Sequence, residues 1–124
     1  KRDLAALPKE LNARVRAEAH RVIALLARKK YEDAAELLPG WTAEKLEAEL
    51  AAFWAANPSM DTTPRARNPR LTQLIEEGPR IWTARHTLLG ATEDADEWML
   101  EATVDLREKL DPDEPLLELR RVGT

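Results

Sequence analysis

The stretch WMLEATVDL, residues 98–106, decides the fold class, because apolar residues recur at every second position and, Met99 apart, polar residues stand between them. Its apolar set is Trp98, Leu100, Ala102, Val104 and Leu106. A period of two is typical of a β-strand with one buried face, since successive side chains point to opposite sides of a sheet. The stretch therefore predicts a strand that contributes one face to a hydrophobic core.

A second stretch, residues 81–89, alternates in the same way. One side of it is formed by Trp82, Ala84, His86 and Leu88. Shorter apolar segments at residues 71–75 and 116–122 predict two further strands. Turn-forming or acidic residues separate the segments, namely Gly78-Pro79, the run from Glu93 to Glu97, and Asp111-Pro112. The second half of the chain thus predicts four antiparallel strands.

The first half has the period of amphipathic helices. After Pro8, whose fixed φ suits a first helical turn, one apolar stripe is formed by Leu11, Val15, Ala19, Val22, Ile23 and Leu26. A short second helix is predicted from Tyr31 to Leu38, where Pro39-Gly40 ends it. Thr42 is the expected N-cap of a third helix, which ends at Asn57-Pro58. The apolar residues of that helix are Leu46, Leu50, Phe53 and Trp54.

Together these elements predict one α+β domain, with three N-terminal helices packed on a curved four-stranded antiparallel sheet. We divide it into a helical half (1–57), a proline- and arginine-rich connection (58–70) and a sheet half (71–124). The connection is expected to be exposed and to lack helix and strand. Helices followed by a bent sheet that closes round them are similar to the nuclear-transport-factor-2-like cone fold. Cones of this kind often hold a ligand pocket, but the small size of this chain favours a filled core.

The composition limits the classes of function. A chain of 124 residues and 14.0 kDa is long enough for one hydrophobic core and too short for two. The lack of cysteine excludes disulfides, thiol nucleophiles and cysteine-ligated zinc, and it fits a reducing compartment. No apolar run approaches the roughly 20 residues that span a bilayer, and no signal-peptide stretch begins the chain. We therefore expect a cytoplasmic protein without membrane contact.

Charge alternates in blocks along the chain. Residues 1–30 have nine bases and three acids, residues 31–61 one base and seven acids, residues 62–90 five bases and two acids, and residues 91–124 four bases and eleven acids. The two basic blocks would attract phosphate groups. The alternative is that they pack beside the acidic blocks within the same fold.

Several short motifs in the second half point to a known family. They are Thr62-Thr63-Pro64-Arg65-Ala66-Arg67-Asn68-Pro69, Trp82-Thr83-Ala84-Arg85-His86, Asp96-Glu97-Trp98 and Val104-Asp105-Leu106. Through them the chain resembles the uncharacterised C-terminal domain of bacterial DEAD/DEAH-box helicases. It departs from the family at Thr63, Arg65 and His86, which replace an expected glycine, aspartate and glutamine.

The resemblance implies helicase motor domains in the same chain and an RNA partner. Neither Gly-x-x-x-x-Gly-Lys-Ser/Thr nor an Asp-Glu-Ala-Asp/His box occurs in these residues, so any ATPase activity would lie upstream.

The candidate nucleic-acid or phosphate-binding residues are Arg65, Arg67, Arg70 and Arg85. Guanidinium groups match phosphate geometry with two parallel hydrogen bonds, and exposed aromatic side chains often add stacking surfaces for bases. Trp82 and Trp98 would supply such surfaces, although their apolar alternations favour core packing. Pairing of the arginines with the acidic run from Glu93 to Glu97 is the alternative.

His86 is the candidate residue for a pocket, which Trp82 and Trp98 would also line. A general base at His86 would need an acid such as Asp105, but Asp105 belongs to the polar alternation of its strand. A hydrogen-bonded structural histidine is therefore favoured, and we assign no catalytic residue. His20 has no second ligand at metal-binding spacing, so we expect neither a metal site nor a cofactor.

These observations favour a non-catalytic accessory domain of a helicase, which packs on the motor or assists placement of its RNA substrate. One alternative is a small cone-fold enzyme or ligand-binding protein that uses the pocket with His86. The second alternative is a protein-interaction or dimerisation domain that associates through its sheet face.

Overall fold

The computed structural model describes residues 3–90, 98–108 and 114–124. Three α-helices come first, α1 (Pro8–Ala27), α2 (Tyr31–Glu36) and α3 (Ala43–Ala56). Four strands follow, β1 (Thr72–Gly78), β2 (Ile81–Leu88), β3 (Trp98–Asp105) and β4 (Glu118–Gly123). Short 3-10 helices are η1 (Leu4–Ala6), η2 (Pro64–Arg67) and η3 (Pro69–Leu71). The predicted α+β class, with helices ahead of an antiparallel sheet, is confirmed.

Helix α1 begins at Pro8 and buries the whole predicted apolar stripe. It ends in a Schellman motif, in which Lys30 N donates to Leu25 O and Lys29 N donates to Leu26 O, both at 2.9 Å. Lys29 takes the left-handed position of this motif, with φ of 57°. A residue that bears a Cβ therefore occupies a position where glycine is usual.

Helix α2 begins at the predicted Tyr31 but ends at Glu36, two residues before the predicted end at Leu38, whereas α3 begins after the predicted N-cap Thr42. Gly40, with φ of 83°, follows α2 and turns the chain toward α3. The Thr42 hydroxyl caps α3 by accepting a hydrogen bond of 3.2 Å from Lys45 N. Asn57 is the C-cap, and its side-chain Nδ2 donates to Phe53 O at 3.1 Å. The local signals for both helices are thus confirmed.

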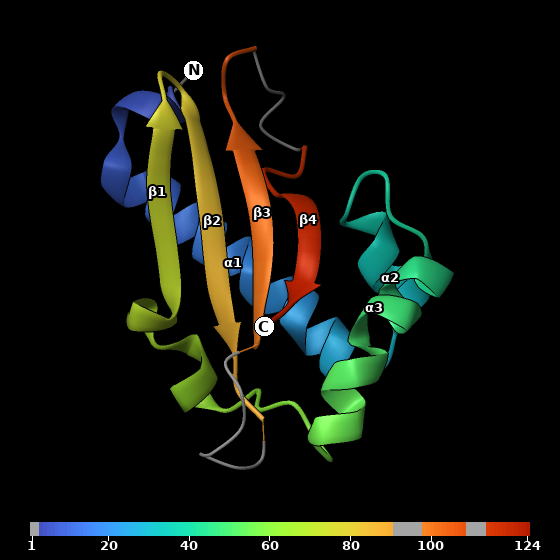
Figure 1. The fold of residues 1–124 in the computed structure, drawn as a ribbon. Helices are drawn as coiled ribbons and strands as arrows, with labels where there is room; N and C mark the ends of the chain where they lie inside the picture. Colours follow the sequence, from blue (N-terminus) through green and yellow to red (C-terminus); the bar gives the residue numbers. More distant parts are fainter. Residues whose placement is uncertain (1–2, 91–97, 109–113) are drawn as a thin grey trace.

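The sheet is an antiparallel meander in the order β1-β2-β3-β4. In its register Ala84 lies opposite Ala102 and His86 lies opposite Leu100, so the predicted apolar sets of β2 and β3 share one face. Helix α1 crosses this face (Figure 1). No helix covers the other face in the described residues (Figure 1). There, a polar row crosses all four strands through Gln73, Arg85, Glu101 and Arg121.

The core consists of two adjoining clusters. One joins α1 to the middle of the sheet and contains Leu11, Val15, Ala19, Ala84, Ala102, Val104, Leu106, Leu116 and Leu117. The other joins the end of α1 to α2, α3 and the far end of the sheet, and contains Leu26, Leu38, Leu46, Leu50, Phe53, Trp98 and Leu119 among others. Helices α2 and α3 lie beside the β4 edge (Figure 1).

The connection 58–70 differs in part from its prediction. It has no α-helix or strand, but it contains the two 3-10 turns η2 and η3 and a single bridge from Met60 to Gly90. Met60 and Ala66 are buried at 6% and 5% exposure, so the expectation of a wholly exposed connection is wrong at these residues. Apolar side chains spaced without period escape a search for helical or strand patterns.

Other predictions have mixed outcomes. The turn at Gly78-Pro79 is confirmed, because β1 ends at Gly78 and β2 begins at Ile81. The Glu93 to Glu97 loop and the Asp111-Pro112 turn lie outside the described residues. Likeness to the nuclear-transport-factor-2-like cone stays a prediction.

Within the described residues, every helix falls short of the length or apolarity that a membrane span requires.

Candidate functional site

The arginine-rich segment from Asp61 to Leu71 is held in place by hydrogen bonds at its start. Asp61 N donates to Leu89 O at 2.7 Å, which ties the segment to the end of β2. Asp61 Oδ1 accepts from the Thr63 hydroxyl at 2.6 Å and from Thr63 N at 2.7 Å. The hydrogen bond from the Thr63 hydroxyl, more than any other contact, lowers the pKa of the Asp61 carboxyl. Together with Pro64 and Pro69, these bonds make the segment a fixed support.

Three of the predicted arginines lie on this support and are exposed. Arg65 Nε is 3.5 Å from Asp61 Oδ2, and its side chain is 53% exposed. Arg67 Nη1 donates to the carbonyl oxygen of Thr62 at 3.1 Å. Arg70 N donates to Asn68 Oδ1 at 3.0 Å, which fixes its backbone while its side chain remains exposed. Arg65, Arg67 and Arg70 therefore all lie exposed on the consecutive turns η2 and η3.

Arg85 does not join this group. It lies on the uncovered face of the sheet, where Arg85 Nε donates to Glu101 Oε2 at 2.8 Å. Arg121 Nε is 3.6 Å from the other oxygen of the same carboxylate. The hydrogen bond from Arg85 is the largest cause of the lowered pKa of Glu101. Glu101 is therefore the observed acidic partner of Arg85, whereas the predicted partners from Glu93 to Glu97 lie outside the described residues.

Of the two candidate stacking tryptophans, Trp98 lies in the core and Trp82 packs against its edge. Trp98 is 8% exposed and contacts Phe53 edge-on, with ring centroids 5.5 Å apart. Trp82 is half-buried and packs against the cluster beneath α1. These positions match the apolar alternations of β2 and β3 and leave neither ring fully open for a stacked base.

His86 is buried against α1 at 3% exposure. Its Nδ1 is 2.7 Å from the Thr72 hydroxyl, and its ring contacts His20 edge-on with centroids 5.5 Å apart. Burial, followed by the nearby His20, lowers the pKa of His86 to about 4. Nε2 of both histidines is buried without a hydrogen-bond partner among the described residues. His86 is thus a buried ring that is neutral at neutral pH, and the half-buried His20 beside it also has a pKa that burial lowers.

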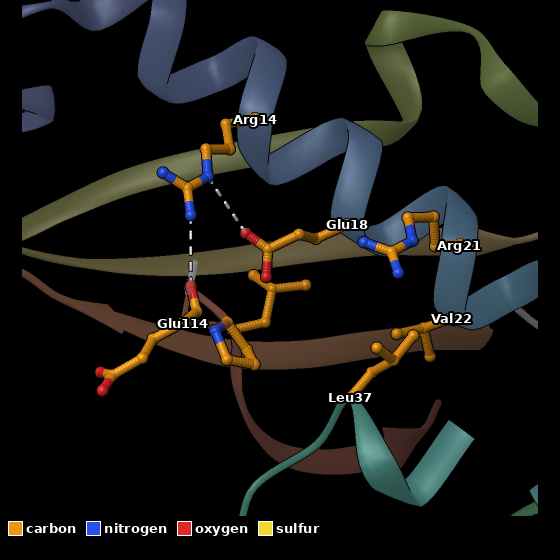
Figure 2. Close-up of a pocket in the computed structure, with 8 residues that line it drawn as sticks. Arg14, Glu18, Arg21, Val22, Leu37 and Glu114 are labelled. Atoms are coloured by element: carbon orange, nitrogen blue, oxygen red, sulfur yellow. Dashed lines mark hydrogen bonds and ion pairs between the residues drawn. The ribbon is translucent and has the colours of Figure 1, made fainter. Parts of the chain in front are cut away.

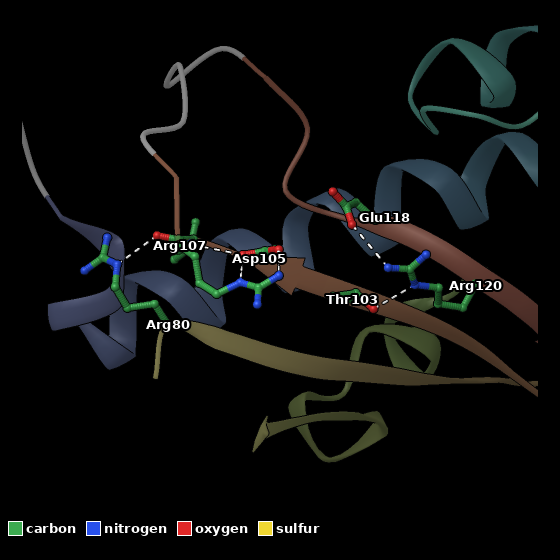
Figure 3. A network of polar contacts seen from close by, with 7 residues as sticks. Arg80, Thr103, Asp105, Arg107, Glu118 and Arg120 are labelled. Carbon is green, nitrogen blue, oxygen red and sulfur yellow. Dashed lines mark hydrogen bonds and ion pairs between the residues drawn. The ribbon is translucent and has the colours of Figure 1, made fainter. Parts of the chain in front are cut away.

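Asp105 does not form a dyad with His86. It lies opposite Ile81 in the register and belongs to the uncovered face, whereas His86 points toward α1. Its carboxylate is bound instead by Arg107, with Nη2 to Oδ2 at 2.7 Å (Figure 3). The hydrogen bond from Arg107 is the main cause that lowers the pKa of Asp105 to about 2. A hydrogen-bonded histidine at the core is thus the observed arrangement.

Arg16 is a neighbour of the arginine segment that the sequence patterns did not single out. Arg67 and Arg16 both contribute, after burial, to lowering the pKa of His20, so their positive charges lie near the same ring. Positive charge therefore continues from η2 to α1. The excess of bases in residues 1–30 was a signal for such a surface, but helical periodicity alone does not show which base approaches residue 67.

No three side chains of the metal-ligating types His, Cys, Asp and Glu come together at metal-binding distance in residues 3–90, 98–108 and 114–124. The charged groups of the arginine segment are mainly guanidinium groups. The site can therefore bind an anionic partner through hydrogen bonds and positive charge.

Comparison with known proteins gives one match. Neither a curated protein nor a solved structure matches the chain. The family model described as a domain of unknown function (DUF3516) matches residues 1–122, which is nearly the whole sequence. The chain therefore belongs to the DUF3516 family.

Proposed function

We propose that this protein is a non-catalytic accessory domain that binds the phosphate backbone of single-stranded RNA through Arg65, Arg67 and Arg70. It does so beside helicase motor domains in the same chain, as the resemblance of its motifs implies. The observation that carries the proposal is the set of three exposed arginines on a segment whose backbone is already fixed. A preformed segment loses little conformational entropy on binding, so more of its interaction energy contributes to affinity.

Arg16 extends this surface onto α1. Its charge and that of Arg67 act on the same histidine, and α1 belongs to the most basic block of the sequence. Several cations along one path can contact successive phosphates, whereas an isolated arginine contacts one. Such binding places RNA without reading its bases, because phosphate contacts carry no sequence information.

The non-catalytic part of the proposal is supported by the position of His86. Its ring is buried between β2 and α1 and is hydrogen-bonded to the Thr72 hydroxyl. The sheet separates it from Asp105. A general base must reach the proton that it removes, and His86 lies out of reach of a substrate at the surface.

The test is the binding of a short, labelled single-stranded RNA, measured by fluorescence anisotropy at several salt concentrations. The triple variant Arg65→Ala, Arg67→Ala, Arg70→Ala is compared with a control triple variant, Arg28→Ala, Arg107→Ala, Arg120→Ala. The control removes the same charge from exposed positions outside the segment. For three lost contacts to single-stranded phosphates, the slope of log K against log salt should become shallower by about 2.

Salt-dependent binding that the first triple variant loses and the control keeps would support phosphate recognition by η2 and η3. Equal loss in both variants would show an effect of net charge alone. Absence of binding by the unchanged protein at low salt would overturn direct RNA contact and leave docking on the motor as the function to pursue.

A further inference from the structure

A hollow of about 310 Å³ lies between α1 and the chain that leads into β4. Arg14, Glu18 and Arg21 of α1 line one side of it, and Leu37 lies near its end (Figure 2). Its volume is at the lower end of the range for small-molecule sites in proteins. The arginine segment on η2 and η3 contributes no residue to its lining, so the hollow is separate from the proposed RNA site.

Glu18 is held rigidly at the hollow by one of its two oxygens. Oε1 accepts a hydrogen bond of 2.7 Å from Leu116 N. Oε2 is buried and has no hydrogen-bond partner in the part of the chain that the structure describes, although Arg14 Nε is 3.8 Å away. Arg14 is itself turned toward the Glu114 carbonyl oxygen, to which its Nη2 donates at 3.2 Å (Figure 2). Oε2 is thus an oriented acceptor that lacks a donor.

Burial is the main cause that raises the pKa of Glu18. A carboxylate that has lost water without gaining a full set of donors is stabilised by any positive group that reaches it. The geometry and the electrostatics of Glu18 therefore point to the same kind of partner, a charged donor.

Arg21 supplies the opposite charge to the same hollow. It lies one helical turn beyond Glu18 and is exposed, yet no ion pair within 4.0 Å joins Arg21 to Glu18. The carboxylate and the guanidinium thus face one space without a close ion pair, although the charge of Arg21 partly offsets the raised pKa of Glu18. A molecule that carries both charges would bridge them.

Four apolar residues line the hollow beside Glu114. Val22 and Leu117 are buried, and Leu37 and Pro115 are partly exposed where they line the hollow. An aliphatic group placed against these side chains would leave water, which favours binding in proportion to the apolar area covered.

We propose that this hollow binds a small zwitterion of the apolar α-amino acid class. Its ammonium group donates to Glu18 Oε2, its carboxylate accepts from the Arg21 guanidinium, and its aliphatic side chain lies against Val22, Leu37 and Leu117. This arrangement supplies a donor to Glu18 Oε2, an anion to the exposed Arg21 and an apolar contact in one molecule. It is independent of RNA binding.

The test is titration of the ¹⁵N-labelled protein with L-leucine, followed by amide chemical shifts. Saturable shifts confined to the amides near residues 14–22, 37 and 114–117 are expected. Isoamylamine, which lacks the carboxylate, and N-acetyl-L-leucine, which lacks the ammonium group, should each bind at least about tenfold more weakly, as expected for loss of a charged hydrogen bond.

Arg21→Gln should weaken leucine binding by at least about tenfold, and Glu18→Gln should weaken it while keeping an acceptor for Leu116 N. Arg28→Gln is the matched control, because Arg28 is exposed just beyond the C-terminal end of α1 and does not line the hollow. It should leave leucine binding unchanged.

Three results would overturn the proposal. The first is no shift with leucine at about 10 mM, which is well above the affinity range of a working site. The second is leucine binding by Arg21→Gln that is as strong as leucine binding by the unchanged protein. The third is saturable binding of adenosine monophosphate at these amides where leucine causes no shift, which would assign the hollow to a phosphate-bearing ligand.

Discussion

The indole Nε1 of Trp41 donates a hydrogen bond of 2.8 Å to the main-chain carbonyl oxygen of Leu119 in strand β4. Nearby, Glu49 Oε1 of α3 accepts from Val122 N at 3.2 Å. Strand β4 is the last in the sheet, so these side chains occupy main-chain groups that no further strand pairs with in the described residues. Side chains from the helical half thus satisfy two main-chain groups at this edge of the sheet.

Replacement of Trp41 by Phe should destabilise the protein by about 1–3 kcal/mol, because the buried carbonyl of Leu119 loses its donor. Trp54→Phe is the matched control, since both indoles carry a lysine ammonium over the ring, at 4.4 Å for Trp41 and 4.8 Å for Trp54. The Trp54 indole bonds to the half-buried hydroxyl of Tyr31, which water can reach. Urea unfolding should show a clearly smaller loss of stability for Trp54→Phe than for Trp41→Phe. Equal losses would contradict a stabilising role for the hydrogen bond from Trp41 to Leu119 O.

Stability should fall with acid in a window set by His86. Its pKa is about 4 in the folded protein and near 6.5 when unfolded, so only the unfolded chain takes up this proton between those values. The contribution of neutral His86 is therefore complete above pH 6.5 and is lost as the pH falls toward 4. The loss amounts to about 3 kcal/mol, an order-of-magnitude figure.

The measurement is the free energy of unfolding at pH 7 and at pH 4.5 for the unchanged protein and for His86→Gln. The variant should show a shallower decline, since the carboxyl groups titrate alike in both proteins. Titration of the His86 ring followed by NMR gives a direct check. A midpoint near 6.5 would refute the buried, neutral state.

Gly90 should tolerate no larger residue. A Cβ at this position would collide with Oδ1 and Cγ of Asn57, whose side chain is buried at 1% exposure and fixed to Phe53 O. We expect Gly90→Ala to cost about 1–3 kcal/mol, because the cap of α3 must move. Gly78→Ala is the control, where the nearest atom would be Ile81 Cγ2 at an ordinary 3.5 Å. Its effect should remain within about 0.5 kcal/mol in the same thermal unfolding experiment.

Thr42→Ala should destabilise the protein by about 1 kcal/mol through loss of the N-cap of α3. The bond from Lys45 N to the Thr42 hydroxyl is the one removed. Thr62→Ala is a control at an exposed position, and it should change the stability by less than about 0.5 kcal/mol. Chemical unfolding that ranks Thr62→Ala as the more harmful change would contradict the capping role.

The sequence predicted the features that depend on neighbouring residues. The stripe from Leu11 to Leu26, the cap at Thr42 and the alternation from Trp98 to Val104 follow from local periods and local hydrogen bonds, and each is confirmed. Burial of Trp98 and His86 also follows from alternation.

Contacts between distant parts of the chain escaped prediction. Glu18 reaches Leu116 across 98 positions, and Trp41 reaches Leu119 across 78. No period in the sequence encodes such pairs, because they depend on how α1 and α3 lie against the sheet. The separation of Arg85 from the other three arginines has the same cause, since strand register alone determines that Glu101 lies beside it.

The two edges of the sheet resist the addition of another strand by different physical means. At β4 two main-chain groups, Leu119 O and Val122 N, are occupied by Trp41 and Glu49, and the neutral bond from Trp41 does not depend on salt. At β1 the exposed pair Glu76 and Glu77 offers like-charge repulsion, which ions screen over a few ångströms at molar salt. Concentrated salt would therefore remove the protection of the β1 edge only, so that self-association by strand pairing would join β1 of two copies and stop at a dimer.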